Sequence, residues 1–243
     1  SLCSSGMNDF SCLFFWDGLF AASAFAWFQP EIAKDIVRCC LLPVDETTFA
    51  THERKFHLPA NGVPNQAAPQ SPVGAWAVLE IWRADGDLDF LKEIFPLLLA
   101  NHRFWIDHCD SAGDGLCEYR WSGQNADDSP LWDSVPTETD ETGCKWLPPV
   151  ASVALNCFLH WDALHIVEIA RLLGCEEEAA NYKVQAEELA GNLWRVCYRE
   201  DLRRFLDFDH ATKEHTKVKT FYLFWPLVCG MPLPEDWVRE MVD

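Results

Sequence analysis

The sequence is short of positive charge. Its 243 residues include 38 aspartates and glutamates but only 19 lysines and arginines, which gives a formal net charge of -19 at pH 7. A nucleic acid or an anionic membrane surface requires a basic footprint on the protein that binds it. We therefore expect neither nucleic acid nor membrane among the partners, and a neutral or cationic ligand fits this charge better.

Regular cysteine spacing is also lacking. The 11 cysteines form no CxxC pair and accompany no histidine-rich cluster, so the sequence favours neither a disulfide framework nor a zinc site. Cys157, Cys197 and Cys229 lie in apolar runs and are expected to be buried as small hydrophobic residues. This usage indicates a reducing compartment, and we expect a cytoplasmic protein that needs no metal and no cofactor.

Membrane-length apolar runs, a recognisable leader and a fixed-period repeat are missing as well. The 49% of hydrophobic residues excludes global disorder and suffices for a large core. Tryptophan is plentiful, with 12 residues. Indole rings fill cores, but they are also common platforms for the apolar faces of sugar rings.

Apolar residues recur at helical spacing through most of the chain. The pattern predicts eight helices that pair into four αα-hairpins, with Ser71-Pro72 starting the third helix, Gly174 ending the fifth, and a turn or short hairpin at 199–215. Such hairpins suit an all-α fold, either a solenoid or an α/α toroid with inner and outer helices; the missing repeat disfavours a standard solenoid. The expected helices are 17–29, 30–42, 73–83, 88–109, 149–173, 176–198, 218–229 and 234 to the end.

The segment from Asp110 to Ser134 follows neither a helical nor a strand period, although it is rich in acidic and aromatic residues. Connections of this length usually carry function. Carboxylates beside flat apolar rings are suited to acid–base chemistry on a sugar. The alternative is a solvated acidic loop, and Trp121 and Trp132 count against it.

Six segments stand out in order along the chain: Phe15–Gly18 with Pro30-Glu31, Gly62–Pro64, Gln70–Val73, Gly113–Tyr119, Asp127–Asp133 and Leu155-Asn156. They resemble motifs of the (α/α)6-barrel glycoside hydrolases of family 63, which include mannosylglycerate hydrolases and processing α-glucosidases. Trehalases share a weaker version of the set. The resemblance implies one catalytic domain, residues 1–243, that holds about eight of the twelve helices of such a barrel.

The same resemblance implies an inverting exo-glycosidase that acts on a small α-glucoside or α-mannoside, with Asp127 as the general acid. Asp128 stands where the family has asparagine, so it is the alternative acid. The residues expected to contact the carbohydrate are Phe14, Trp16, Asp17, Gln70 and Trp132. Asp17 is equally suited to cap a helix, Gln70 could be a plain loop residue, and Trp132 could be a lid residue packed on the core.

Three departures from the family pattern keep other functions open. The Glu that precedes the acid in the family is replaced by Trp121, Leu131 stands for an Arg, and Ala154 for an Asp. The catalytic base of the family comes from the later part of its barrel, so we assign none here and expect the C-terminal half of the barrel as a partner. The alternatives are an inactive sugar-binding remnant and a helical scaffold for protein partners.

Overall fold

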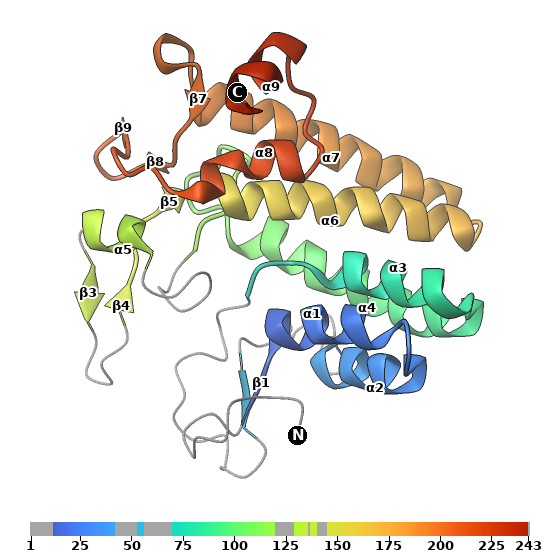
Figure 1. Ribbon diagram of the computed structural model, residues 1–243. Helices are drawn as coiled ribbons and strands as arrows, with labels where there is room; N and C mark the ends of the chain where they lie inside the picture. The colour runs from blue at the N-terminus through green and yellow to red at the C-terminus, as the bar shows by residue number, and fades with distance from the viewer. Residues whose placement is uncertain are drawn as a thin grey trace. The chain divides into compact units, whose positions relative to one another are not determined.

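The computed structural model describes residues 12–41, 53–55, 70–119, 129–135, 137–139 and 145–242 (Figure 1). The chain divides into two compact units, residues 1–104 with 165–180, and residues 105–164 with 181–243. Three long helices, α4 (Leu88–His108), α6 (Val153–Leu172) and α7 (Glu176–Val196), contribute segments to both units.

The first unit is built on helices α1 (Phe15–Phe25), α2 (Pro30–Leu41) and α3 (Gly74–Asp85), which pack against one another (Figure 1). A short strand, β1 (Cys12–Phe14), leads directly into α1 and pairs antiparallel with β2 (Glu53–Lys55). The helix buries Phe15, Leu19 and Ala22. The chain therefore enters α1 from an extended segment that the strand pair positions.

A buried lysine joins three helices of this unit. The side chain of Lys34 in α2 is only 4% exposed, and its Nζ lies 2.6 Å from Asp85 and 2.7 Å from Asp87. Burial alone would lower the pKa of Lys34, but hydrogen bonds to these carboxylates outweigh it and raise the pKa. Asp87 also accepts a hydrogen bond from the backbone of Phe90, so it caps α4 as well. Removing the lysine would leave two carboxylates facing each other at this junction.

The second unit surrounds a core formed by α6 and α7 with the shorter helices α8 (Trp225–Val228) and α9 (Glu235–Val242) (Figure 1). The rings of Phe158 in α6 and Trp225 in α8 lie 5.4 Å apart. The unit also holds the segment Asp110–Tyr119 and the short helix α5 (Pro130–Ser134). Its buried core residues are Leu116, Ala151, Val153, Cys157, Ala190, Leu193, Cys197, Phe205, Cys229, Met231 and Trp237.

Short strands cover one end of the core. β5 (Val150–Ala151), β8 (Phe208–Asp209) and β9 (Glu214–His215) form an antiparallel sheet, with Val150 opposite Asp209. β6 (Tyr198–Arg199) pairs with β7 (Arg204–Phe205), and β3 (Glu138–Thr139) pairs with β4 (Lys145–Trp146). The turn or hairpin predicted at 199–215 is thus confirmed.

Three predicted helices are wrong in their bounds. The first, expected over 17–29, spans Phe15–Phe25. The fifth begins at Val153 rather than near Pro149, because Val150 and Ala151 pair with β8 as a strand. The seventh, expected over 218–229, consists of a 3-10 turn at Phe221–Phe224 followed by α8. Pro226 has no N–H to donate, so it is tolerated only in a first turn and α8 starts beside it.

Other boundary signals had mixed outcomes. The cap of α3 is Val73 rather than Ser71, whereas Gly174 follows α6 with the predicted left-handed φ of 74°. By length and composition α6 could cross a membrane, contrary to our expectation of no such run. However, 78% of that stretch is buried inside the protein, as in the core helix of a globular domain.

The three cysteines singled out in the sequence are unpaired and buried. Burial raises the pKa of Cys157 and Cys197 well above the usual range and that of Cys229 to about 12. They therefore act as inert hydrophobic residues, as predicted.

Candidate functional site

Trp16 and Gln70 lie together, although 54 residues separate them in the sequence. Gln70 is 3% exposed, and its Oε1 accepts a hydrogen bond of 3.0 Å from the backbone N–H of Trp16. The first N–H groups of a helix have no partner within the helix, and the N-cap residue, Phe14, supplies no side-chain bond. Gln70 therefore caps α1 from a distance, and its interpretation as a plain loop residue is wrong.

Asp17 is the third residue of α1, so its interpretation as the N-cap is also wrong. It is exposed, yet the surrounding protein partly desolvates its carboxylate and raises its pKa; hydrogen bonds from its own backbone N–H and from the Trp16 side chain oppose that rise. A carboxylate and an indole are thus adjacent in the first turn of α1. The carboxylate can accept from hydroxyl groups, and the ring can cover an apolar face.

A row of aromatic rings continues from Trp16. The ring of Phe20, which is 44% exposed, lies 5.8 Å from Trp16 and 5.3 Å from Trp76 of α3. Phe14 ends β1 and is half-buried just before the helix. Sequence reasoning missed Phe20 and Trp76 because both positions read as ordinary core positions of apolar helices.

The acidic segment between α4 and α5 begins as an ordered loop. Asp110 accepts hydrogen bonds from the backbone N–H groups of Gly113 and Gly115 at 2.7 and 2.8 Å. Glu118, 3% exposed, accepts from the N–H groups of Ser111 and Ala112 at 2.8 and 3.2 Å. These carboxylates hold the backbone, so this part of the segment is not a solvated acidic loop.

Asn156 fixes the far side of the same loop. Its Oδ1 accepts from the N–H of Cys117 at 2.8 Å, and its Nδ2 donates to the carbonyls of Cys117 and Ser152 at 2.9 Å. Nearby, His210 Nε2 lies 3.7 Å from Asp114 and 3.9 Å from Glu118. The segment Gly113–Tyr119 and the motif at Leu155-Asn156, both noted in the sequence, are therefore parts of one scaffold.

The remaining predicted site residues are not tested by this geometry. Asp127 and Asp128 lie outside the described residues, as do Trp121 and the residues that follow it up to Asp128. Trp132 lies in α5, which Ser129 caps by accepting from the N–H of Leu131 at 3.4 Å; the Trp132 side chain is not described. Among the sequence-predicted residues, the structure brings Phe14, Trp16, Asp17 and Gln70 together.

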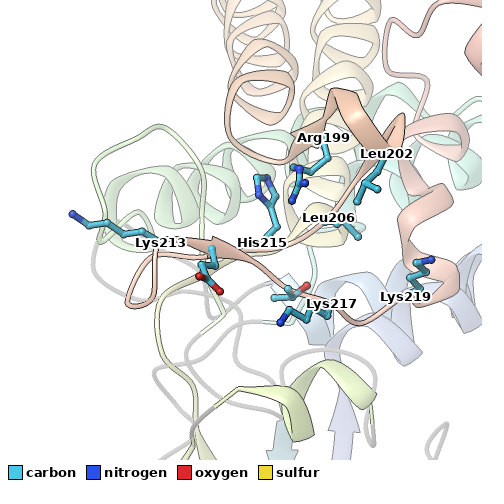
Figure 2. A pocket seen from close by; sticks show the side chains of 9 residues that line it. Arg199, Leu202, Leu206, Lys213, His215, Lys217 and Lys219 are labelled. Atoms are coloured by element: carbon cyan, nitrogen blue, oxygen red, sulfur yellow. The ribbon is translucent and has the colours of Figure 1, made fainter.

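Two hollows lie elsewhere, in the second unit. One, of about 510 Å³, is lined by β6, β9 and the segment after β9 (Figure 2). The other, of about 590 Å³, is lined by residues of β7, the 3-10 turn and Trp237. Neither contains a residue predicted from the sequence. Within the described ranges, no group of three or more His, Cys, Asp or Glu side chains could hold a metal ion.

Comparison with known families gives one match over almost the whole chain. The model of the mannosylglycerate hydrolase MGH1-like glycoside hydrolase domain matches residues 13–243. Among solved structures, the chain resembles the family 63 mannosylglycerate hydrolase of Thermus thermophilus in complex with Tris and D-glycerate, with a TM-score of 0.80 and 19% identity. That match covers 96% of this chain and 70% of the other.

Trehalases are also similar. The neutral trehalase of Saccharomyces cerevisiae matches with a TM-score of 0.72 at 14% identity, over 99% of this chain and 54% of the trehalase. A probable trehalase of Oryza sativa subsp. japonica is 29% identical over 105 residues; this match covers 41% of the chain but only 16% of the rice protein. The structural similarities confirm the predicted α/α-barrel fold, here as a partial barrel.

Proposed function

Because the chain belongs to the mannosylglycerate hydrolase MGH1-like glycoside hydrolase family, we propose that it hydrolyses a small α-glucoside or α-mannoside with inversion at the anomeric carbon. Crystals of the Thermus thermophilus relative contain glucose in one case and D-glycerate in another. Trehalases are among the other similar proteins. We therefore take mannosylglycerate, its glucosyl counterpart and trehalose as the first substrates to test.

The arrangement at the start of α1 is the observation that carries this proposal. A hexose offers an apolar ring face and neighbouring hydroxyl groups, and Trp16 and Asp17 supply a ring and an acceptor in one helical turn. Gln70 holds the backbone of this turn by its bond to the Trp16 N–H. The side-chain NH₂ of Gln70 is the group that we propose as the donor to a substrate hydroxyl.

Asp127 is our proposed general acid, on the strength of its place in the segment that resembles the family motif. In an inverting mechanism the acid protonates the leaving oxygen while a second carboxylate activates water on the opposite face of the sugar. The two carboxyl groups are then roughly 6.5 to 9.5 Å apart. We assign no base within this sequence, and we propose that the later part of the family's barrel supplies it.

Paired substitutions test the acid. Asp127→Asn should lower kcat by about a hundredfold or more while sugar binding is kept, because a general acid contributes to the transition state. Asp128→Asn is the matched control and should retain most activity. The reverse result would move the assignment to Asp128, and equal retention in both variants would exclude this pair.

The anomeric form of the product tests the stereochemistry. Proton NMR during the first minutes of hydrolysis should show the β-anomer released from an α-linked substrate. The α-anomer would contradict inversion. If the chain, together with the part of the barrel that supplies the base, binds a sugar but never cleaves a glycoside, it is a sugar-binding remnant; if it binds none, the scaffold alternative takes over.

A further inference from the structure

The 510 Å³ hollow of the second unit is lined by lysines. In the described part of the chain, these lysines form no ion pair with an acidic residue. The hollow is lined by Lys213, Lys217 and Lys219 together with Arg199 and Glu214. The three lysines are exposed, and no ion pair joins them to any described carboxylate. In a chain with twice as many acidic as basic residues, this local excess of positive charge is unusual.

The local sequence explains why the cations gather. Lys217 and Lys219 flank Val218 in the segment after β9, and both side chains line the hollow. Lys213 differs, because its φ of 58° turns the chain, and Figure 2 shows its side chain directed away from the others. Lys217 and Lys219 are therefore the cations that line the hollow along the chain.

The opposite wall adds a fixed guanidinium. Arg199 donates from Nε and Nη2 to Asp201 at 2.7 and 2.6 Å, which locks its orientation and offsets its charge. His215 Nε2 bonds the carbonyl of Val196 at 3.0 Å. Burial lowers the pKa of His215 and the charge of Arg199 adds to this, while the bond to Val196 and the charge of Asp201 oppose it, so the ring favours its neutral form. The lining then has a formal excess of two positive charges, from three lysines and Glu214.

Apolar side chains complete the hollow. Leu206 is buried, and Leu202 is shared with the neighbouring 590 Å³ hollow, as is Lys219. Charges beside apolar walls act in a lower effective dielectric than charges on an open surface, so they attract an anion more strongly.

We propose that this hollow, with Lys217 and Lys219 as its principal ligands, is a binding site for a small polyanion that bears phosphate or several carboxylates. Its lining residues all belong to the second unit and include none of the sugar contacts proposed at α1. Lysine ammonium groups are strong donors to both kinds of anion, and the volume admits a compact metabolite rather than an extended polymer.

Calorimetric titration of the whole chain with inorganic pyrophosphate and, separately, with citrate tests the site. We expect saturable binding that weakens as sodium chloride is added. Lys217→Gln with Lys219→Gln should weaken it by about tenfold or more. Lys183→Gln, an exposed lysine of α7 in the same unit that lies 3.9 Å from Glu187, is the matched control and should leave it unchanged.

The two probes separate the sources of anion. Binding of pyrophosphate alone identifies a phosphate ligand, and binding of citrate alone a polycarboxylate; either supports the site. Absence of binding by both probes, or equal binding by the double variant and the parent chain, would overturn it. A large loss of thermal stability in the double variant without any anion binding would also overturn the site. The lysines would then stabilise the fold by pairing with an acidic segment of the chain itself.

Discussion

At the scale of single residues, Asp207 is the clearest case of a carboxylate in an apolar setting. It is buried, and its Oδ1 accepts from the N–H of Val153 at 2.7 Å, so it caps α6. Burial raises its pKa to about 6, against the lowering effect of the hydrogen bonds from the backbone. The folded protein therefore binds a proton more readily at this site than the unfolded chain does.

The raised pKa of Asp207 makes the stability of the fold depend on pH. A carboxyl group with a raised folded pKa stabilises the fold fully below its unfolded pKa, and that contribution is lost as the pH rises through about 6. Asp207→Asn keeps an oxygen acceptor but cannot ionise. Its stability relative to the parent chain should thus rise between about pH 4 and pH 7, by about 3 kcal/mol at most.

Urea unfolding across this pH range measures the effect. Asp201→Asn provides a control of opposite sign, because the hydrogen bond from Arg199 lowers the pKa of Asp201. Its stability relative to the parent chain should fall slightly as the pH rises. A relative stability of Asp207→Asn that stays flat with pH would show that the carboxyl is not shifted.

Substitutions can distinguish the proposed sugar contact of Trp16 from the structural role of Gln70. Trp16→Leu removes the ring but keeps the backbone N–H that Gln70 accepts, so sugar binding should be lost with little change in stability. Gln70→Met has a similar size but no acceptor, and it leaves the N–H of Trp16 unpaired, at a cost of about 1–3 kcal/mol. Sugar titration and thermal unfolding of both variants check this. Equal sugar affinity in Trp16→Leu and the parent chain would remove the aromatic platform from the proposal.

At the scale of elements, the loop Asp110–Tyr119 shows how glycines permit close packing. Gly113 and Gly115 both have a left-handed φ, 69° and 80°. A Cβ at Gly113 would meet nothing within 4 Å, whereas one at Gly115 would lie 2.2 Å from Asn192 Nδ2. Asn192 also donates to the carbonyl of Gly115 at 3.2 Å. A methyl group at Gly115 would therefore require the Asn192 side chain to move.

The two glycines make a matched pair of substitutions. Gly113→Ala should cost about 1–2 kcal/mol for the left-handed backbone alone. Gly115→Ala should cost more, by about another 1 kcal/mol or more, because Asn192 must move and lose its bond. Chemical denaturation measures both. Equal losses of stability in the two variants would mean that the Asn192 side chain moves aside at no cost in free energy.

The helices were readable from the sequence where local signals decide them. Pro30 marks the first residue of α2, Glu176 that of α7, and Gly174 the end of α6, as predicted. The short strands were not readable, since Val150 becomes a strand only by pairing with Asp209, 59 residues away. Tertiary pairing overrides local propensity at such places.

The candidate site was predictable in part, for the same reason. The resemblance of motifs supplied Trp16, Asp17 and Gln70, but no spacing rule indicates that Gln70 caps the turn holding Trp16. The hollow at Lys217 and Lys219 did leave a signal, two lysines separated by one valine in a short segment that carries three lysines. An interpretation that starts from the overall negative charge misses a small region where positive charges are in excess.

At the scale of the whole molecule, the charge of -19 and the isoelectric point of about 4.7 predict how stability responds to salt. Unpaired carboxylates at neutral pH repel one another in the compact state, and salt screens that repulsion. Buried pairs such as Lys34 with Asp85 are screened much less. Sodium chloride should therefore raise the Tm at pH 7, most steeply at low concentrations.

Near the isoelectric point the same addition should have little effect, which separates screening from general salting-out. A Tm that falls with salt at pH 7 would show that attractive surface pairs outweigh the repulsion.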